Sequence, residues 1–212
     1  MYVCSIIKEM TARLVVLISG NGSNLQAILD ACKSGDLAAR VVAVISNKPD
    51  AHGLIRAGNA GVEAIHFPKL ENESRDDYDA RLGDHVANRE PDYVVLAGWM
   101  RLLTSTFLSR FPNRVVNLHP ALPGTFPGTH AIERAYEAWQ KGGINSTGVM
   151  VHLVPDEGVD NGPVLATEVV PILSDDSLES LETRVHETEH RILVETLKKL
   201  VSTPIQNPSS KS

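Results

Sequence analysis

The chain has 212 residues, of which 42% are hydrophobic, which is enough for one substantial core but short for two. Its formal net charge of −6, without a dense run of lysine or arginine, argues against binding to nucleic-acid phosphates. The two cysteines, Cys4 and Cys32, show neither CxxC nor zinc-ligand spacing. We therefore expect a reducing, cytoplasmic compartment, without a disulfide framework or a metal site.

The two ends of the chain differ from the rest in composition. Residues 1–10 (MYVCSIIKEM) are too short and too interrupted by charge for a signal peptide or a membrane span, and no other apolar run reaches membrane length. We predict an N-terminal extension at 1–12, a single domain at 13–201 and a disordered tail at 202–212, which is polar and rich in proline and serine. The sequence leaves open whether the protein is a monomer or a homodimer.

Short aliphatic runs alternate with helical patterns along the first two-thirds of the chain. The aliphatic runs predict strands at residues 13–19, 41–46, 62–67, 93–97 and 115–118. Apolar residues at helical spacing predict three helices, marked by Leu25, Ile28, Leu29 and Cys32, by Tyr78, Leu82, His85 and Val86, and by Ile132, Ala135, Tyr136 and Trp139. This alternation predicts an α/β fold with a mostly parallel twisted sheet and helices on both faces.

The last third of the chain departs from this alternation. Residues 146–154 and 164–171 read as two strands, and antiparallel pairing through the loop at 155–163 is their simplest arrangement. The segment from Asp176 to Glu179 has the pattern of a capping box that opens a long helix. The apolar stripe of that helix consists of Leu178, Leu181, Val185, Ile192, Leu193, Leu197 and Leu200.

Two polar residues end the strand predicted at 115–118. Asn117 and His119 are two positions apart, so both side chains point to the same side of the pleat, and Pro120 stops the strand just beyond them. Ligands of open α/β sheets bind beyond the carboxyl ends of the strands. An amide donor and a titratable nitrogen there suit oxyanion stabilisation and proton transfer. The alternative is a strand-end pair that only completes hydrogen bonds.

A glycine-rich turn, SGNGSN at residues 19–24, joins the first predicted strand to the first helix. Gly20 and Gly22 permit a tight turn, and the free N–H groups of a helix start attract a phosphate or carboxylate. The turn fails as a dinucleotide fingerprint, because Leu25 replaces the third glycine and the second strand ends in Ser46-Asn47-Lys48 instead of an acidic residue. A phosphate monoester is therefore favoured over NAD, and a turn without any ligand is the alternative.

The loop at 155–163 carries three carboxylates and two glycines. Taken alone, such an acidic loop is more often a solvated turn than a catalytic element. Asp160 gains interest if the sheet brings it beside His119, because its carboxylate would raise the pKa of that imidazole and orient the ring.

Together these motifs make the chain similar to the phosphoribosylglycinamide formyltransferases, a folate-dependent family of purine synthesis. The resemblance runs from about residue 13 to 201 and rests on five motifs in the family's order: SGNGSN at 19–24, VVLAGWMRLL at 94–103, VVNLHP at 115–120, PGTH at 127–130 and DEGVDNGPV at 156–164. It implies a Rossmann-like formyltransferase fold and small-molecule substrates, with 10-formyltetrahydrofolate as formyl donor.

The resemblance implies that Asn117, His119 and Asp160 are catalytic. The substrate amine would attack the formyl carbon directly, without a metal or a covalent enzyme intermediate. Asn117 and a protonated His119 would stabilise the oxyanion. Asp160 would keep His119 protonated and help to carry the proton from the amine to the folate nitrogen.

The resemblance also implies two sets of binding residues. Those for the phosphoribosyl substrate are Gly22, Ser23, Asn24, His186, Glu187, Thr188 and Glu189. Those for the folate are Arg75, Met100, Arg101, Leu102, Leu103, Asn117, Asp156, Glu157, Gly158, Val159 and Asp160. Arg75 could equally be an exposed arginine at a helix start, and Glu189 a charged residue facing solvent.

One segment departs from the family pattern. The family commonly reads Ser-Leu-Leu-Pro-Lys after the His-Pro pair, where this chain has Ala-Leu-Pro-Gly-Thr at residues 121–125. The shifted proline and the missing lysine put the loop path in doubt, together with one anion contact.

Other functions compete with this interpretation. Formyltransferases that act on methionyl-tRNA add a C-terminal RNA-binding domain, and formyltetrahydrofolate hydrolases add a regulatory domain, for neither of which this sequence has room. A non-catalytic nucleotide- or folate-binding module would not need the amide, imidazole and carboxylate.

Overall fold

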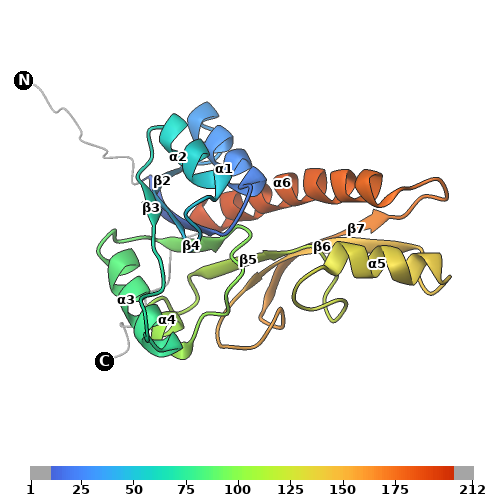
Figure 1. The fold of residues 1–212 in the computed structure, drawn as a ribbon. Helices are drawn as coiled ribbons and strands as arrows, with labels where there is room; N and C mark the ends of the chain where they lie inside the picture. The colour runs from blue at the N-terminus through green and yellow to red at the C-terminus, as the bar shows by residue number, and fades with distance from the viewer. Residues whose placement is uncertain (1–10, 203–212) are drawn as a thin grey trace, which may run out of the picture.

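The structure, a computed structural model, describes residues 11–202. In this range the strands form one sheet in the order β3-β2-β1-β4-β5-β6-β7 (Figure 1). The strands are β1 (Ala12–Ile18), β2 (Ala39–Ser46), β3 (Ala64–His66), β4 (Tyr93–Leu96), β5 (Val115–His119), β6 (Ser146–Leu153) and β7 (Val164–Pro171). The first five pair in parallel, and β6 and β7 are antiparallel to their neighbours. The predicted fold class is confirmed, including the antiparallel pair.

Six helices surround the sheet within the described residues. They are α1 (Ser23–Ser34), α2 (His52–Asn59), α3 (Arg75–Ala87), α4 (Ser105–Leu108), α5 (Ala131–Gln140) and α6 (Leu178–Ser202). In Figure 1, α1, α2 and α6 lie on one side of the sheet, and α3 and α4 on the other. None of the helices between residues 11 and 202 is long and apolar enough to cross a membrane.

Side chains of β1 alternate between two hydrophobic cores, because successive residues of a strand point to opposite faces. Leu14, Val16 and Ile18 pack with α1, α2 and α6, whereas Val15 and Leu17 pack with α3 and α4. All five are fully buried. The first strand is therefore apolar on both faces, as expected for the centre of a parallel sheet.

Helix α6 begins one residue away from the predicted capping box. Ser177 and Ser180 cap it reciprocally: the Ser180 N–H donates to Ser177 Oγ (3.1 Å), and the Ser177 N–H to Ser180 Oγ (3.0 Å). Asp176 does not cap the helix, because its carboxylate binds the guanidinium of Arg184 at 2.7 and 2.8 Å. The predicted Asp176–Glu179 box is wrong, although the apolar stripe is buried or packed against the core as expected.

Two helices were absent from the prediction. Helix α2 has the sequence HGLIRAGN, with two glycines and eight residues, and α4 has only four residues, so neither carries a full helical repeat of apolar positions. β1 starts at Ala12 and α6 ends at Ser202, one residue outside each predicted domain boundary. The predictions for residues 1–10 and 203–212 lie outside the described residues.

The strand order fixes where a ligand can bind. The chain moves outward from β1 to β3 and then returns to the other side of β1 as β4, which makes a topological switch point between β1 and β4. Loops that follow neighbouring strands diverge at such a point and leave a crevice at the carboxyl ends of the strands. Here the loops after β1, β4 and β5 gather at this edge.

Candidate active site

A cavity of about 490 Å³ opens at the carboxyl edge of β1, β4 and β5. The site residues predicted from the sequence that line it are Asn24, Met100, Arg101, Leu102, Leu103, Asn117, Asp156, Glu157, Gly158, Val159, Asp160, His186 and Glu189. The predicted residues that are not part of the lining are Gly22, Ser23, Arg75, His119, Glu187 and Thr188. The cavity therefore joins stretches that are far apart in the sequence.

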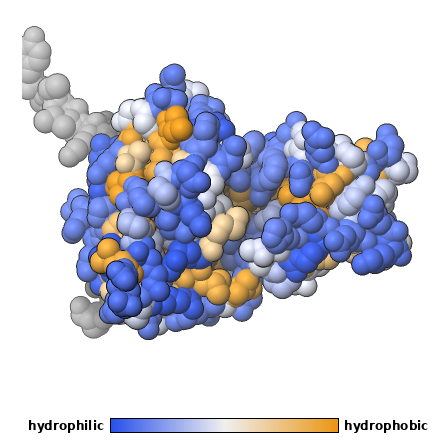
Figure 2. All heavy atoms as spheres, viewed as in Figure 1, coloured by the Kyte–Doolittle hydropathy of each residue, from blue (hydrophilic) through white to orange (hydrophobic). Residues whose placement is uncertain are grey.

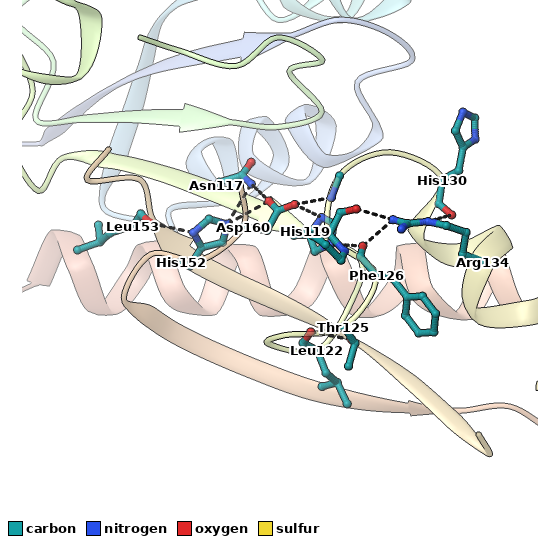
Figure 3. A network of polar contacts seen from close by, with 12 residues as sticks. Asn117, His119, Leu122, Thr125, Phe126, His130, Arg134, His152, Leu153 and Asp160 are labelled. Carbon is teal, nitrogen blue, oxygen red and sulfur yellow. Dashed lines mark hydrogen bonds and ion pairs between the residues drawn. The ribbon is translucent and has the colours of Figure 1, made fainter. Parts of the chain in front are cut away.

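Asn117, His119 and Asp160 meet beside this cavity (Figure 3). The first two lie on β5, and Asp160 reaches them from the loop between β6 and β7. Asp160 Oδ1 accepts a hydrogen bond from Asn117 Nδ2 at 3.1 Å, and Oδ2 lies 3.3 Å from His119 Nδ1. The Gly128 N–H also donates to Oδ2, at 2.8 Å. Asp160 has the left-handed backbone conformation (φ 52), which is uncommon for a residue other than glycine and often marks a functional site.

His152 is a fourth member of this cluster, and the sequence analysis did not find it. It faces Asn117 directly across the β5–β6 pairing, and its Nε2 lies 3.1 Å from Asn117 Nδ2 and 3.5 Å from Asp160 Oδ1. Its Nδ1 lies 2.8 Å from the carbonyl oxygen of Leu153, so Nδ1 carries the proton and Nε2 accepts. The only signal in the sequence is a histidine near the end of the strand predicted at 146–154. Its partner depends on the register between β5 and β6, which the sequence does not reveal.

Both N–H groups of the Asn117 side chain are engaged in this arrangement. One N–H goes to Asp160 and the other to His152, and the carboxylate fixes the amide orientation because it can only accept. Donation from Asn117 to an oxyanion would therefore require it to give up one of these two bonds.

His119 is buried, with a side chain only 6% exposed, and it does not line the cavity. Its Nε2 faces the carbonyl oxygen of Phe126 at 3.0 Å. Burial lowers the pKa of His119 below its ordinary value, and the opposing effects of the Asp160 carboxylate and the Phe126 carbonyl do not outweigh it. The Asp160 carboxylate raises the pKa of His119, as expected from the sequence, whereas the larger effect of burial opposes the protonated form.

Asp160 is ionised in this environment. Burial opposes its charge, but the interaction with His152, the hydrogen bond from the Gly128 N–H and the interaction with His119 hold the pKa of Asp160 below its usual value. The site thus pairs a carboxylate with two histidines.

The departure at residues 121–125 forms a closed turn next to this cluster. The Thr125 N–H and hydroxyl both donate to the carbonyl oxygen of Leu122, at 3.0 and 2.7 Å, and Gly124 has a φ of 76. Phe126 follows this turn directly. Its carbonyl oxygen faces His119 and also accepts a hydrogen bond from Arg134 of α5 (Figure 3). With the altered sequence at 121–125, the chain therefore still folds back so that Phe126 lies against His119.

The glycine-rich turn places the start of α1 at the edge of the cavity. Gly22 is the N-cap, with a φ of 75, and the first helical hydrogen bond runs from the Gln26 N–H to its carbonyl. The N–H groups of Ser23 and Asn24 precede that bond and are free of helical partners. On the outer side, Arg56 donates to the carbonyl oxygen of Asn21 at 2.9 Å. This terminus has the geometry and dipole that favour an anion.

Helix α6 contributes only one face to the cavity. His186 and Glu189 are three residues apart and lie together, with His186 Nδ1 2.7 Å from Glu189 Oε2. Glu189 is buried rather than facing solvent, and Asn24 Nδ2 donates to it at 3.3 Å. Oδ1 of Asn24 is buried without a partner among the described residues, which leaves an acceptor available. The hydrogen bond to Glu189 raises the pKa of His186.

The two intervening residues of α6 point elsewhere. Glu187 is exposed, and the Thr188 hydroxyl donates to the carbonyl oxygen of Arg184 in the preceding turn, at 2.9 Å. A helix cannot direct four consecutive side chains to one side, which is why the predicted stretch divides in this way.

The remaining lining comes from the loop after β4 and the acidic loop. Met100 and Leu102 are largely exposed at the cavity, whereas Arg101 lies over the Tyr78 ring, 4.5 Å from its centroid. Glu157 accepts a hydrogen bond from the Ser105 N–H at 2.9 Å, and its other oxygen lies 3.6 Å from Arg75. Arg75 thus pairs with the acidic loop outside the cavity. Elsewhere, hydrophobic residues on the face shown in Figure 2 form scattered patches among hydrophilic ones.

A carboxylate, an amide and two imidazoles lie together at the switch-point crevice of this open α/β sheet, and such groups can bind an oxyanion and transfer protons. The model of the formyl transferase family matches residues 12–197, and the chain belongs to this family. It is 45% identical to the phosphoribosylglycinamide formyltransferase of Dictyostelium discoideum, with 90% of this chain and 98% of that protein covered. It is also 45% identical to the enzyme of that name from Schizosaccharomyces pombe, with 91% and 99% covered.

A solved structure shows the same fold. Glycinamide ribonucleotide transformylase 1 from Symbiobacterium toebii superposes with a TM-score of 0.85 at 41% identity, and the match covers 93% of this chain and 92% of that one. The resemblance inferred from the motifs is therefore confirmed along the domain.

Proposed function

We propose that this chain transfers the formyl group of 10-formyltetrahydrofolate to the glycinamide amine of N1-(5-phospho-D-ribosyl)glycinamide, a step of purine (IMP) biosynthesis. The observation that carries the proposal is the 45% identity to phosphoribosylglycinamide formyltransferases over nearly their entire length. The cavity supports it, because the N-terminus of α1, whose free N–H groups suit an anion, and an apolar loop both adjoin one space beside the Asp160 carboxylate.

The proposed substrate sites follow from the charge of the lining. The phosphate binds at the start of α1, at Gly22, Ser23 and Asn24, and the buried carboxylate of Glu189 accepts from the ribose hydroxyls. The pterin lies between two loops, where the exposed side chains of Met100 and Leu102 cover the ring and the acidic loop offers polar groups to its edge. In this arrangement the amine and the formyl carbon meet beside Asp160.

The proposed chemistry assigns the first proton contact to Asp160. This residue lines the cavity and is ionised, whereas His119 lies behind it with a pKa that burial lowers. The ammonium that forms on attack therefore passes its proton toward the Asp160–His119 pair and from there to the departing folate nitrogen. The oxyanion is stabilised by Asn117 after it gives up one of its two bonds.

Steady-state turnover tests this function. The purified protein is incubated with 10-formyltetrahydrofolate and the phosphoribosyl-glycinamide amine, and the release of tetrahydrofolate and the formylated product are followed together. Stoichiometric formation of both products is expected. Release of tetrahydrofolate without the amine would instead indicate a hydrolase, and folate binding without turnover a binding module.

We also infer small-molecule substrates without a nucleic-acid or membrane partner, and a cytoplasmic location, from the acidic charge and the cysteine usage. The choice between a monomer and a homodimer stays open. Sedimentation velocity of the assayed protein would decide it.

A further inference from the structure

Ser19 is the first residue of the glycine-rich turn, yet it contacts the loop after β4. Its N–H donates to the carbonyl oxygen of Gly98 at 3.0 Å, and its Oγ accepts a hydrogen bond from the Met100 N–H at 2.9 Å. Ser19 is half-buried at the switch point and does not line the cavity. Its hydroxyl therefore acts through the loop rather than on a ligand.

A third residue fixes the direction of this hydroxyl. The Ser19 O–H donates to Oδ1 of Asn47, directly after β2, at 2.7 Å. A serine hydroxyl has one proton and two lone pairs, so donation to Asn47 turns the lone pairs toward the Met100 N–H. The chain of bonds from Asn47 through Ser19 to Met100 crosses three neighbouring strand ends, and each bond polarises the next.

The loop from Gly98 to Thr104 is also held at its far end. Thr104 N–H donates to the carboxylate of Asp79, which is buried on α3. Met100, which is anchored by Ser19, lines the cavity together with Arg101, Leu102 and Leu103, which lie between the two anchored ends. Met100 is 67% exposed, so packing does little to hold it and the backbone anchor sets its position.

We propose that Ser19 is a positioning residue for the formyl donor: its hydroxyl sets the Met100 backbone, and with it the wall against which the pterin packs. This inference rests on the proposed function, and it assigns Ser19, a residue of the glycine-rich turn, to the binding of the folate rather than of the phosphorylated substrate. Phosphate binding depends on the N–H groups at the start of α1, which Ser19 precedes.

The kinetic split between the two substrates tests the proposal. In Ser19→Ala the backbone bond to Gly98 stays, and only the hydroxyl bonds are lost. Since one hydrogen bond contributes about 0.5–1.5 kcal/mol, we expect the KM for 10-formyltetrahydrofolate to rise about threefold to tenfold. The KM for the phosphoribosyl substrate should stay within about twofold. Asn47→Ala, which frees the hydroxyl to rotate, should shift the folate KM in the same direction by less.

Ser46→Ala provides a matched control. Ser46 Oγ accepts a backbone hydrogen bond from the Lys48 N–H at 3.0 Å, at the end of the neighbouring strand, and does not line the cavity. Its removal should leave both KM values unchanged. Quenching of the fluorescence of Trp99, which precedes Met100 and lines the cavity, gives the folate dissociation constant independently.

The outcomes separate this inference from the proposed function. Absence of formyl transfer by the unaltered protein would remove the proposed function. If the unaltered protein is active and Ser19→Ala either leaves the folate KM unchanged or raises both KM values equally, Ser19 is not a positioning residue for the donor. A folate-selective change in Ser46→Ala as well would have the same meaning.

Discussion

Nδ1 of His119 lies 3.3 Å from Oδ2 of Asp160, and both side chains are largely buried, with 6% and 11% of their surfaces exposed. One comes from the end of β5 and the other from the loop that joins the antiparallel strands β6 and β7. The carboxylate also bonds Asn117 and the Gly128 N–H and approaches His152, so one residue organises the whole cluster.

Asp160→Asn should lower kcat by about 10²–10⁴-fold, the usual contribution of a group that transfers a proton. The amide is isosteric but uncharged, and its NH₂ group would oppose the donors that now face the carboxylate. Stopped-flow or steady-state formyl transfer measures the change, with circular dichroism to check the fold. Asp50→Asn, at an exposed position outside the cavity lining, should keep the full rate. A near-normal rate in Asp160→Asn would exclude its proposed role.

The imidazole of His119 should titrate below its ordinary pKa of about 6.5. Asp160 opposes the effect of burial, so Asp160→Asn should lower the pKa of His119 further. Two-dimensional NMR of the histidine ring protons from pH 4 to 8 measures both values. A midpoint above the ordinary value, or an upward shift in the variant, would contradict the assignment.

The same shift has a consequence for stability. The pKa of His119 is lower in the folded protein than in the unfolded chain, so between these two pKa values only the unfolded chain binds a proton at His119. The contribution of His119 to the free energy of unfolding therefore decreases as the pH falls from about 6.5 to the folded pKa. Urea titrations at several pH values should show a weaker decrease in His119→Gln. An equal decrease in both proteins would count against the buried, neutral imidazole.

Ser23→Asp should separate stability from substrate binding. A negative charge at the start of α1 favours the helix dipole by about 0.3–1 kcal/mol, so the melting temperature should be unchanged or raised. The same charge should raise the KM of the phosphorylated substrate about tenfold or more and that of the folate much less. The neutral Ser23→Asn serves as the size control. Equal effects on both substrates would argue against a phosphate at this terminus.

Gly22→Val is a poorer test of the phosphate site. A Cβ at Gly22 would lie 2.7 Å from the Cα of Gly53, and the φ of 75 is unfavourable for a branched residue. This variant would distort the turn before any ligand binds.

Asp176→Ala should destabilise the fold by about 2–3 kcal/mol, because the buried carboxylate makes charge-assisted bonds to Arg184 and also bonds the Leu173 N–H and the Ser180 hydroxyl. Urea unfolding at pH 7 measures the change. The hydrogen bond with Arg184 holds the pKa of Asp176 well below its usual range, although burial acts in the opposite direction. The contribution of Asp176 to the free energy of unfolding should therefore be lost as the pH falls below about 4. The exposed neighbour Asp175→Ala should change stability by less than about 0.5 kcal/mol. Similar losses in both variants would contradict this account.

Much of the architecture could be predicted from local patterns. The runs at 13–19 and 93–97 place apolar side chains on both faces of the sheet. This property is typical of a buried parallel strand. Helix α2 was missed because its glycines and short length hide the periodicity. The start of α6 was misplaced because Asp176 and Ser177 are both good N-caps, and the ion pair of Asp176 with Arg184 decided between them.

For the candidate site, the sequence by itself determined the residue types and their placement at strand and helix ends, including Asn117 and His119 on one side of β5. Only the tertiary structure decided which of them meet. The β5–β6 register brought His152 opposite Asn117, and the pitch of α6 kept His186 and Glu189 at the cavity while directing Glu187 and Thr188 away. Burial lowered the pKa of His119. Local spacing fixes the direction of a side chain along its own element, whereas partners and desolvation depend on segments that are distant in the chain.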